Sequence, residues 1–127
     1  MSAACVLVIE DDPFIRDTLQ ELLELEGFSV AAAENGRAGL NLLTPEAPPR
    51  LILLDLMMPV MDGWEFLEII HREPRDYRAA IPIVVVSAAA NVAQGLKEQH
   101  GCEVMPKPVD VDRLLKLVHT HCGPLGG

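Results

Sequence analysis

Short apolar runs alternate with longer amphipathic stretches along this chain of 127 residues. The runs are rich in aliphatic and β-branched side chains, which is typical of strands buried on both faces. They predict strands over 4–9, 28–33, 51–54, 81–86 and 102–105. The stretches between them repeat apolar residues at helical spacing and predict helices from Pro13 to a stop at Gly27, and over 36–43, 63–72, 91–100 and 111–121.

Five strands alternating with five helices predict right-handed crossovers and a parallel sheet covered on both faces. The natural solution is an α/β, flavodoxin-like, doubly wound five-stranded parallel sheet in the order 2-1-3-4-5. The length suits one domain with one core. We expect a single domain over 1–127, with its core at about 4–121 and a flexible tail at 122–127.

Composition narrows the possible partners. The formal net charge is -9, with 19 acidic against 10 basic residues, which argues against direct binding to nucleic acid or to an anionic membrane. The apolar opening is too short for a membrane span and unlike a signal peptide. Three cysteines without metal-type spacing favour a reduced, cytoplasmic protein; they are Cys5, Cys102 and Cys122.

Acidic residues follow two strands that this topology makes neighbours. Asp55 ends the apolar run that begins at Leu51, and Asp11 and Asp12 follow the first strand. Ligands in such sheets sit beyond the carboxyl ends of the strands, so we expect the three carboxylates to converge. Converging carboxylates repel one another unless a cation compensates, and hard oxygen ligands suit Mg²⁺.

Strands four and five bring two further polar side chains to the same edge. Ser87 follows the fourth strand and Lys107 the fifth. Taken singly, Asp12 could be only a helix cap, Ser87 a turn residue and Lys107 a solvated surface lysine. Their joint placement at strand ends favours a site for a phosphoryl group on a carboxylate. The histidines lie near helix ends and are interpreted as neither ligands nor phosphocarriers; they are His71, His100, His119 and His121.

Four segments carry a resemblance to a known family. They are EDD at 10–12, DLMMPVMDG at 55–63, Ser87-Ala88 and Lys107-Pro108. Together they resemble the receiver domain of the two-component response-regulator family over about residues 4–121. The resemblance implies that Asp55 accepts a phosphoryl group from a phosphohistidine on a sensor histidine kinase or phosphotransfer protein, with Mg²⁺ at the site.

The resemblance also implies a role for each acid near Asp55. Asp12 and Asp55 would ligate Mg²⁺ directly, together with the backbone carbonyl of Met57. Asp11 would act largely through water. The protein would then be a signalling switch rather than an enzyme, catalysing only its own phosphoryl transfer and slow dephosphorylation.

The output of the switch is implied in the same way. Ser87 would hydrogen-bond a phosphoryl oxygen, Lys107 would pair with the phosphate, and the Lys107-Pro108 bond resembles the family's cis peptide. A downstream protein target, or a second copy of the chain, would bind the face of the fourth helix, fifth strand and fifth helix. The family usually has Tyr or Phe where this chain has Val104. We therefore expect residues 87–91 and the weak helix after them to carry the change.

Two other classes of function stay open at this point. A phosphohydrolase of the haloacid-dehalogenase type also uses a strand-end aspartate, Mg²⁺, Ser or Thr, and Lys. That family expects a second acid two residues after its nucleophile, where this chain has Met57. A receiver-like module that binds partners without phosphorylation is the third possibility, although the complete acid, serine and lysine set argues against it.

Overall fold

The computed structural model describes residues 4–88 and 93–123. Its strands are β1 (Val6–Ile9), β2 (Val30–Ala33), β3 (Leu51–Asp55), β4 (Ile83–Ser87) and β5 (Glu103–Pro106). Its helices are α1 (Pro13–Leu25), α2 (Gly36–Leu42), α3 (Gly63–His71), α4 (Ala93–His100) and α5 (Val111–Cys122), and a short 3-10 helix, η1 (Tyr77–Ala80), precedes β4.

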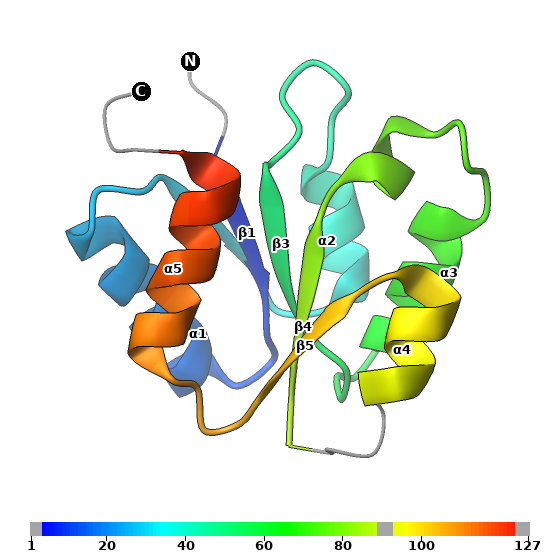
Figure 1. Cartoon of the computed structure of the whole chain (residues 1–127). Coiled ribbons are helices and arrows are strands. Elements are labelled where there is room, and N and C mark those ends of the chain that lie inside the picture. Colours follow the sequence, from blue (N-terminus) through cyan, green and yellow to red (C-terminus); the bar gives the residue numbers. More distant parts are fainter. Residues whose placement is uncertain (1–3, 89–92, 124–127) are drawn as a thin grey trace.

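The five strands form one parallel sheet in the order β2-β1-β3-β4-β5, which confirms the predicted α/β topology (Figure 1). Each pairing is in parallel register. Ile9 lies opposite Leu54, and Asp55 lies opposite Val86. Because the strands run the same way, the ends of β1, β3, β4 and β5 all meet at one edge of the sheet.

Side chains of successive strand residues point to opposite faces, so the sheet separates two apolar cores. Leu7 and Ile9 of β1 belong to one core, with buried residues of α3 and α4. Val6 and Val8 belong to the other, which also holds Leu23 of α1 and buried residues of α5. In Figure 1, α1 and α5 cover one face of the sheet, and α2, α3 and α4 cover the other.

Helix boundaries follow the capping signals in the sequence. Side chains at four N-caps accept backbone N–H bonds; the caps are Asp12, Asn35, Asp62 and Asp110. Gly27 has φ 94° just after α1, as expected of a stop glycine. In the ranges 4–88 and 93–123, no helix is long and apolar enough to cross a membrane.

Some boundaries differ from the expected ones. The polar connection after α3 contains η1, which its composition did not indicate. The predicted start of the fourth helix, at 91 and 92, lies outside the described residues. Helix α5 extends to Cys122, so this residue ends a helix rather than beginning a tail. Gly123, the next residue of the predicted tail, caps α5, and 124–127 lie outside the described residues.

A disulfide corrects the expectation that the cysteines are reduced. Cys5, just before β1, is bonded to Cys122, the last residue of α5, across a sequence separation of 117 residues. Cys102 is a free, buried cysteine. Cysteine spacing could not reveal the pair, because only the folded sheet brings the start of β1 beside the end of α5.

Candidate functional site

A cluster of three carboxylates lies at the carboxyl edge of the sheet. Glu10 and Asp11 directly follow β1, and Asp55 ends the neighbouring strand β3. One oxygen from each side chain lies within 4.8 Å of the other two. Asp11 is exposed, whereas Glu10 and Asp55 are only 4% and 7% exposed. Asp11 and Asp55 therefore converge as predicted, and the third member of the cluster is Glu10, which the sequence interpretation missed.

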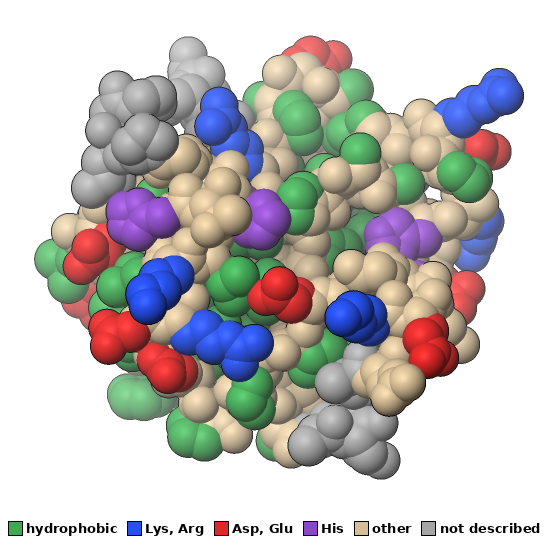
Figure 2. Space-filling model, viewed as in Figure 1, with side chains coloured by type: hydrophobic (Ala, Val, Ile, Leu, Met, Phe, Trp, Pro, Cys, Tyr) green, Lys and Arg blue, Asp and Glu red, His purple; other side chains and the backbone are tan. Residues whose placement is uncertain are grey.

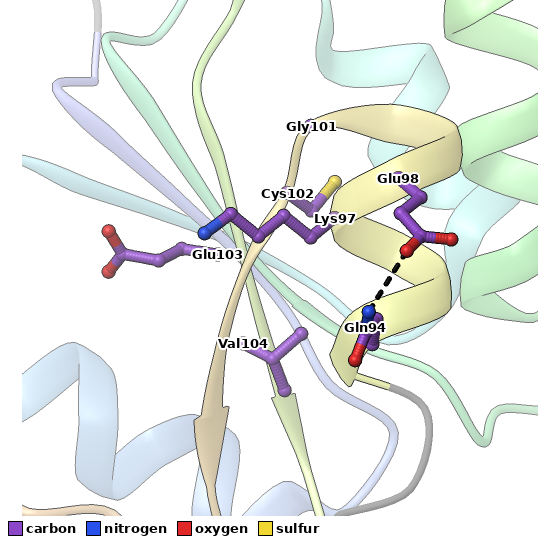
Figure 3. Close-up of a pocket in the computed structure, with 7 residues that line it drawn as sticks. All are labelled: Gln94, Lys97, Glu98, Gly101, Cys102, Glu103 and Val104. Atoms are coloured by element: carbon purple, nitrogen blue, oxygen red, sulfur yellow. Dashed lines mark hydrogen bonds between the residues drawn. The ribbon is translucent and has the colours of Figure 1, made fainter.

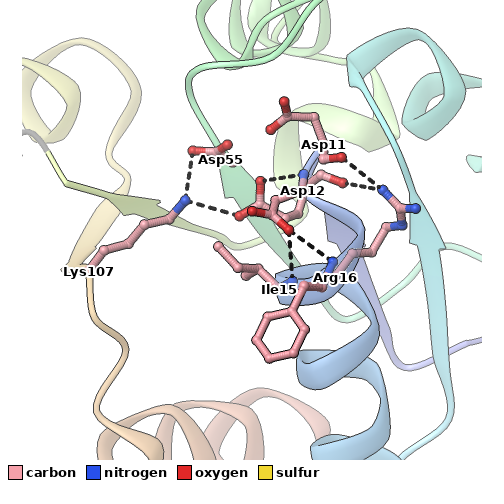
Figure 4. Close-up of polar contacts among 8 residues, drawn as sticks. Asp11, Asp12, Ile15, Arg16, Asp55 and Lys107 are labelled. Carbon is pink, nitrogen blue, oxygen red and sulfur yellow. Dashed lines mark hydrogen bonds and ion pairs between the residues drawn. The ribbon is translucent and has the colours of Figure 1, made fainter.

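Lys107 reaches into this cluster from the segment after β5 (Figure 4). Its Nζ lies 3.0 Å from Glu10 Oε1 and 3.5 Å from Asp55 Oδ1. Burial and a hydrogen bond with Asp55 raise the pKa of Glu10, although Lys107 opposes the shift. Burial acts to lower the pKa of Lys107, but its bond to Glu10 and the negative charges of Asp55 and Glu10 raise that pKa overall. One ammonium group therefore compensates two buried carboxyls.

Asp12 lies outside the cluster, contrary to its predicted role as a direct metal ligand. Its Oδ1 accepts the backbone N–H groups of Phe14 at 2.9 Å and Ile15 at 3.3 Å. The carboxylate is thus used to cap α1, the alternative that the sequence left open, and Pro13 stands at the first helical position. The acids that meet Asp55 are Glu10 and Asp11, one residue earlier in the chain.

Arg16 positions the acid loop, a role that the sequence interpretation missed. Its Nη1 donates to the backbone carbonyl of Glu10 at 2.9 Å and to that of Asp11 at 3.3 Å. Figure 4 shows the Arg16 side chain extending from α1 back toward this loop. The only signal in the sequence was a basic residue in the first turn of a helix that follows three acids. Holding both carbonyls fixes the backbone from which the two carboxylates extend.

Ser87 and Lys107 lie together as predicted. Ser87 ends β4 and is 4% exposed, and its backbone carbonyl accepts the N–H of Lys107 at 3.0 Å. Ser87 is the residue after Val86, which pairs with Asp55. The Lys107-Pro108 peptide bond is cis, as the family resemblance implied. Two neighbouring strand ends thus present a hydroxyl and an ammonium group at the same sheet edge as Asp55.

The turn from β3 into α3 packs tightly against the backbone of Asp55. Gly63, the first residue of α3, donates its N–H to the carbonyl of Leu56 at 2.9 Å. A Cβ atom at Gly63 would lie 2.6 Å from the carbonyl oxygen of Asp55 and 2.8 Å from Leu56 Cα. Only glycine permits this approach, which holds the end of β3 against the start of α3.

The loop between Asp55 and Gly63 contains an unusual turn. Met61 N–H donates to the carbonyl of Pro59 at 2.7 Å across Val60, whose φ is 68°. This is a γ-turn of the rarer, positive-φ kind, and a β-branched residue is strained there. Met57, the second residue after Asp55, has a side chain that is 77% exposed. Because this side chain points to solvent, Met57 can serve the site only through its backbone.

The donor set matches one class of metal ion. All three side chains of the cluster offer carboxylate oxygens, and the exposure of Asp11 leaves room for water ligands. Hard oxygen donors with retained waters are what Mg²⁺ requires. A divalent cation would also relieve the repulsion between Glu10 and Asp55 that contributes to the raised pKa of Glu10.

Curated sequences give two informative matches. The chain is 34% identical to an uncharacterized 14.6 kDa protein of Leptolyngbya boryana, covering 92% of this chain and 88% of that protein. It is 32% identical to the response regulator MprA of Mycolicibacterium vanbaalenii, covering 87% of this chain and 46% of MprA. It thus spans most of the first protein but less than half of the second.

Solved structures agree in fold. A CheY-like response regulator receiver domain protein from Methanospirillum hungatei superposes with a TM-score of 0.80 at 27% identity, covering 95% of this chain and 94% of that one. The response regulator TrrA from Thermotoga maritima, solved with Mg²⁺-BeF, has a TM-score of 0.75 at 28% identity, covering 94% and 98%. The family model for the response regulator receiver domain matches residues 6–119. The chain therefore belongs to the response regulator receiver domain family.

Proposed function

We propose that Asp55 accepts a phosphoryl group from a phosphohistidine on a sensor histidine kinase or a phosphotransfer protein. One observation carries this proposal: the buried Asp55 carboxylate lies in an acid cluster with Lys107 Nζ 3.5 Å from its Oδ1. Members of the family are signalling switches that interact with histidine kinases and downstream targets. Family membership also decides against the haloacid-dehalogenase interpretation.

The proposed transfer breaks the phosphorus–nitrogen bond of the donor and forms a phosphorus–oxygen bond to Asp55. Lys107 is suited to compensate the negative charge of the transferred group, because its ammonium already faces Asp55. Ser87 is suited to donate its hydroxyl to a phosphoryl oxygen from the end of β4. The domain would catalyse its own phosphorylation and slow dephosphorylation and would turn over no separate substrate.

The metal in this proposal is Mg²⁺. Asp11 and Asp55 would be its direct carboxylate ligands, with the backbone carbonyl of Met57 as a third and Glu10 acting through water. When bound, the ion would withdraw charge from the carboxylate and phosphoryl oxygens. Two findings support the assignment: the carboxylate cluster and the Mg²⁺-BeF complex of TrrA.

Intact-mass measurement tests the proposal. We expect a stoichiometric, slowly decaying phosphoryl adduct on the full chain after treatment with a small phosphodonor and Mg²⁺. The Asp55→Asn variant should show no adduct, and omission of Mg²⁺ should suppress it. Equal adduct yield in Asp55→Asn would exclude Asp55, whereas multiple turnover of the donor without an adduct would favour a phosphohydrolase.

For the output, we propose the face formed by α4, β5 and α5. A pocket of about 820 Å³ lies between α4 and β5, and Val104 is among the residues that line it (Figure 3). Its lining includes both positive and negative side chains, those of Lys97, Glu98 and Glu103. Figure 2 shows acidic and basic side chains interspersed across this face. Such mixed charge suits a protein target, or a second copy of the chain, better than a polyanion.

The change that reaches this face is proposed to involve α4. Among the described residues of α4, Leu96 is the one buried apolar side chain, and Gly95 beside it has no atoms near its Cβ position. A helix with so few anchors responds to a small bias at Ser87. When beryllofluoride and Mg²⁺ are added, amide hydrogen exchange should therefore change more in 87–100 than in 114–121. The change in 87–100 should be smaller in Ser87→Ala. A change confined to 10–12 would refute this route.

We propose the cytoplasm as the place of action. A phosphohistidine donor is made from a nucleoside triphosphate, which is a cytoplasmic substrate. Fractionation of cells should recover the protein with soluble cytoplasmic markers. Recovery in an extracytoplasmic fraction would contradict this location.

A further inference from the structure

The Cys5–Cys122 bond joins the two ends of the described fold. Cys5 precedes β1, Cys122 ends α5, and their Cα atoms are 6.1 Å apart, within the usual range for a bridge. Both residues lie at the edge of the sheet where the strands begin, opposite the edge that holds Asp55. A change in this bond therefore acts on the end of α5 without touching the carboxylate cluster.

The two cysteines are anchored very differently. The Cys5 backbone N–H donates to the carbonyl of Ser29 at 2.9 Å, and the Cys5 carbonyl accepts the N–H of Arg50 at 2.8 Å. The carbonyl of Cys122 accepts a long bond, 3.4 Å, from the guanidinium of Arg50, and its side chain is buried in the apolar core. Breaking the disulfide would thus leave Cys5 fixed by its backbone bonds and would loosen the end of α5, because Cys122 would lose its covalent link to the start of β1.

The rest of α5 is held independently of the bond. Val118 is fully buried against the sheet, and the ring of His119 packs edge-on against Phe28 with centroids 4.9 Å apart. These contacts lie in the turn before Cys122. Reduction is therefore expected to loosen the helix end rather than detach the helix.

The third cysteine is insulated from the pair. Cys102 is 3% exposed, and its burial raises the pKa of its thiol to about 11. It also belongs to the apolar core on the other face of the sheet from Cys122. Since the thiolate is the form that attacks a disulfide, Cys102 does not scramble this bond at neutral pH.

From these contacts we propose that Cys5 and Cys122 form a reversible redox clamp on the end of α5. A dithiol reductant would attack at the half-buried Cys5, the S–S bond would break, and both sulfurs would become thiols. Two electrons and two protons pass from the reductant, which becomes a disulfide. The regulatory meaning rests on the proposed cytoplasmic phosphoryl switch, because disulfides in a reducing compartment are usually transient and redox-sensing.

Thiol counting and thermal unfolding of the full chain test the clamp. After equilibration in oxidised glutathione, an alkylating reagent added under denaturing conditions should modify one cysteine, and after dithiothreitol it should modify three. The reduced protein should have a Tm lower by on the order of 10 °C, because a long closed loop is lost. Amide exchange should rise in 119–122 and stay unchanged at 55–63.

Matched variants separate the clamp from a general effect of reductant. Cys102→Ala should keep the Tm difference between oxidised and reduced protein, and Cys5→Ser and Cys122→Ser should each abolish it. Three modified cysteines under oxidising conditions, or equal Tm and α5 exchange in both redox states, would overturn the clamp. Equal phosphoryl adduct in both states supports it. Loss of the adduct in both states refutes the proposed phosphorylation alone, because thiol count and α5 exchange decide the clamp.

Discussion

Lys107 lies closer to Glu10 than to the proposed phosphoacceptor: its Nζ is 3.0 Å from Glu10 Oε1. Glu10 thus holds the lysine 3.5 Å from Asp55 while crowding Asp55 with a second negative charge. One ammonium group thus faces two buried carboxyls, and a bound divalent cation would add further positive charge to this cluster.

Glu10→Gln should stabilise the metal-free protein. The pKa of Glu10 is raised by burial and by Asp55, so its ionised form opposes folding at neutral pH. The neutral amide removes that cost, and we expect a higher urea midpoint in EDTA together with Mg²⁺ binding about tenfold weaker. Urea unfolding and calorimetric Mg²⁺ titration measure the two effects. A lower midpoint in EDTA would show that the ion pair with Lys107 outweighs the repulsion.

Asp11 and Asp12 should behave oppositely when each is replaced by alanine. Asp12→Ala removes the cap of α1 and should cost about 1 kcal/mol of stability while Mg²⁺ binding persists. Asp11→Ala removes a carboxylate of the cluster and should abolish Mg²⁺ binding with little loss of stability. The fluorescence of Trp64, the second residue of α3, can be used to follow both Mg²⁺ binding and unfolding. Loss of Mg²⁺ binding in Asp12→Ala alone would restore Asp12 as a direct ligand.

Gly63→Ala should disturb the site through the backbone of β3. The new methyl group would lie 2.6 Å from the carbonyl oxygen of Asp55, and we expect a loss of about 2 kcal/mol and slower phosphorylation. Gly95→Ala is the matched control, since nothing lies within 4 Å of its Cβ position in α4. It should gain about 1 kcal/mol from helix propensity. Equal effects of the two substitutions on unfolding would contradict the packing argument.

The strands and the topology could be predicted because apolar runs and helical periodicity are local signals. Asp55, Ser87 and Lys107 were found because each ends or follows a strand, and parallel strands end together. Which acids of the run 10–12 enter the cluster was harder to predict. If the helix began one residue earlier or later, two neighbouring acids would exchange the roles of helix cap and cluster member. The backbone conformation, rather than the residue pattern, determines which acid takes which role.

Pairings between distant segments could not be predicted from the sequence, for a different reason. The disulfide and the contact between His71 and His100 each join residues from distant segments, and no local pattern encodes them. The histidines were correctly expected near helix ends, but their pairing was not expected. It follows from the side-by-side packing of α3 and α4.

The histidine pair should make stability depend on pH. His71 Nδ1 lies 2.9 Å from His100 Nδ1, so one ring donates an N–H bond and the other accepts it with an unprotonated nitrogen. Burial and the proximity of His100 lower the pKa of His71 from its ordinary value of 6.5. The unfolded state therefore binds a proton at His71 more readily than the folded state does. The stability that this histidine contributes is present above pH 6.5 and is lost as the pH falls below that value.

Urea unfolding at several pH values between about 8 and about 5, the range over which histidines titrate, measures this dependence. His71→Asn should weaken the loss of stability at the acid end. His121→Gln, at the end of α5, is the control and should keep the wild-type dependence. An unchanged pH profile in His71→Asn would show that the pair does not couple protonation to folding.

The location of the phosphoryl group tests the central claim most directly. After phosphorylation, borohydride reduction converts an aspartyl phosphate to homoserine, and trypsin separates the peptide 51–72, with Asp55, from the peptide 1–16, with Glu10, Asp11 and Asp12. We expect homoserine at Asp55 and unmodified acids in 1–16. Homoserine at Asp11 or Asp12, with Asp55 unchanged, would contradict the account.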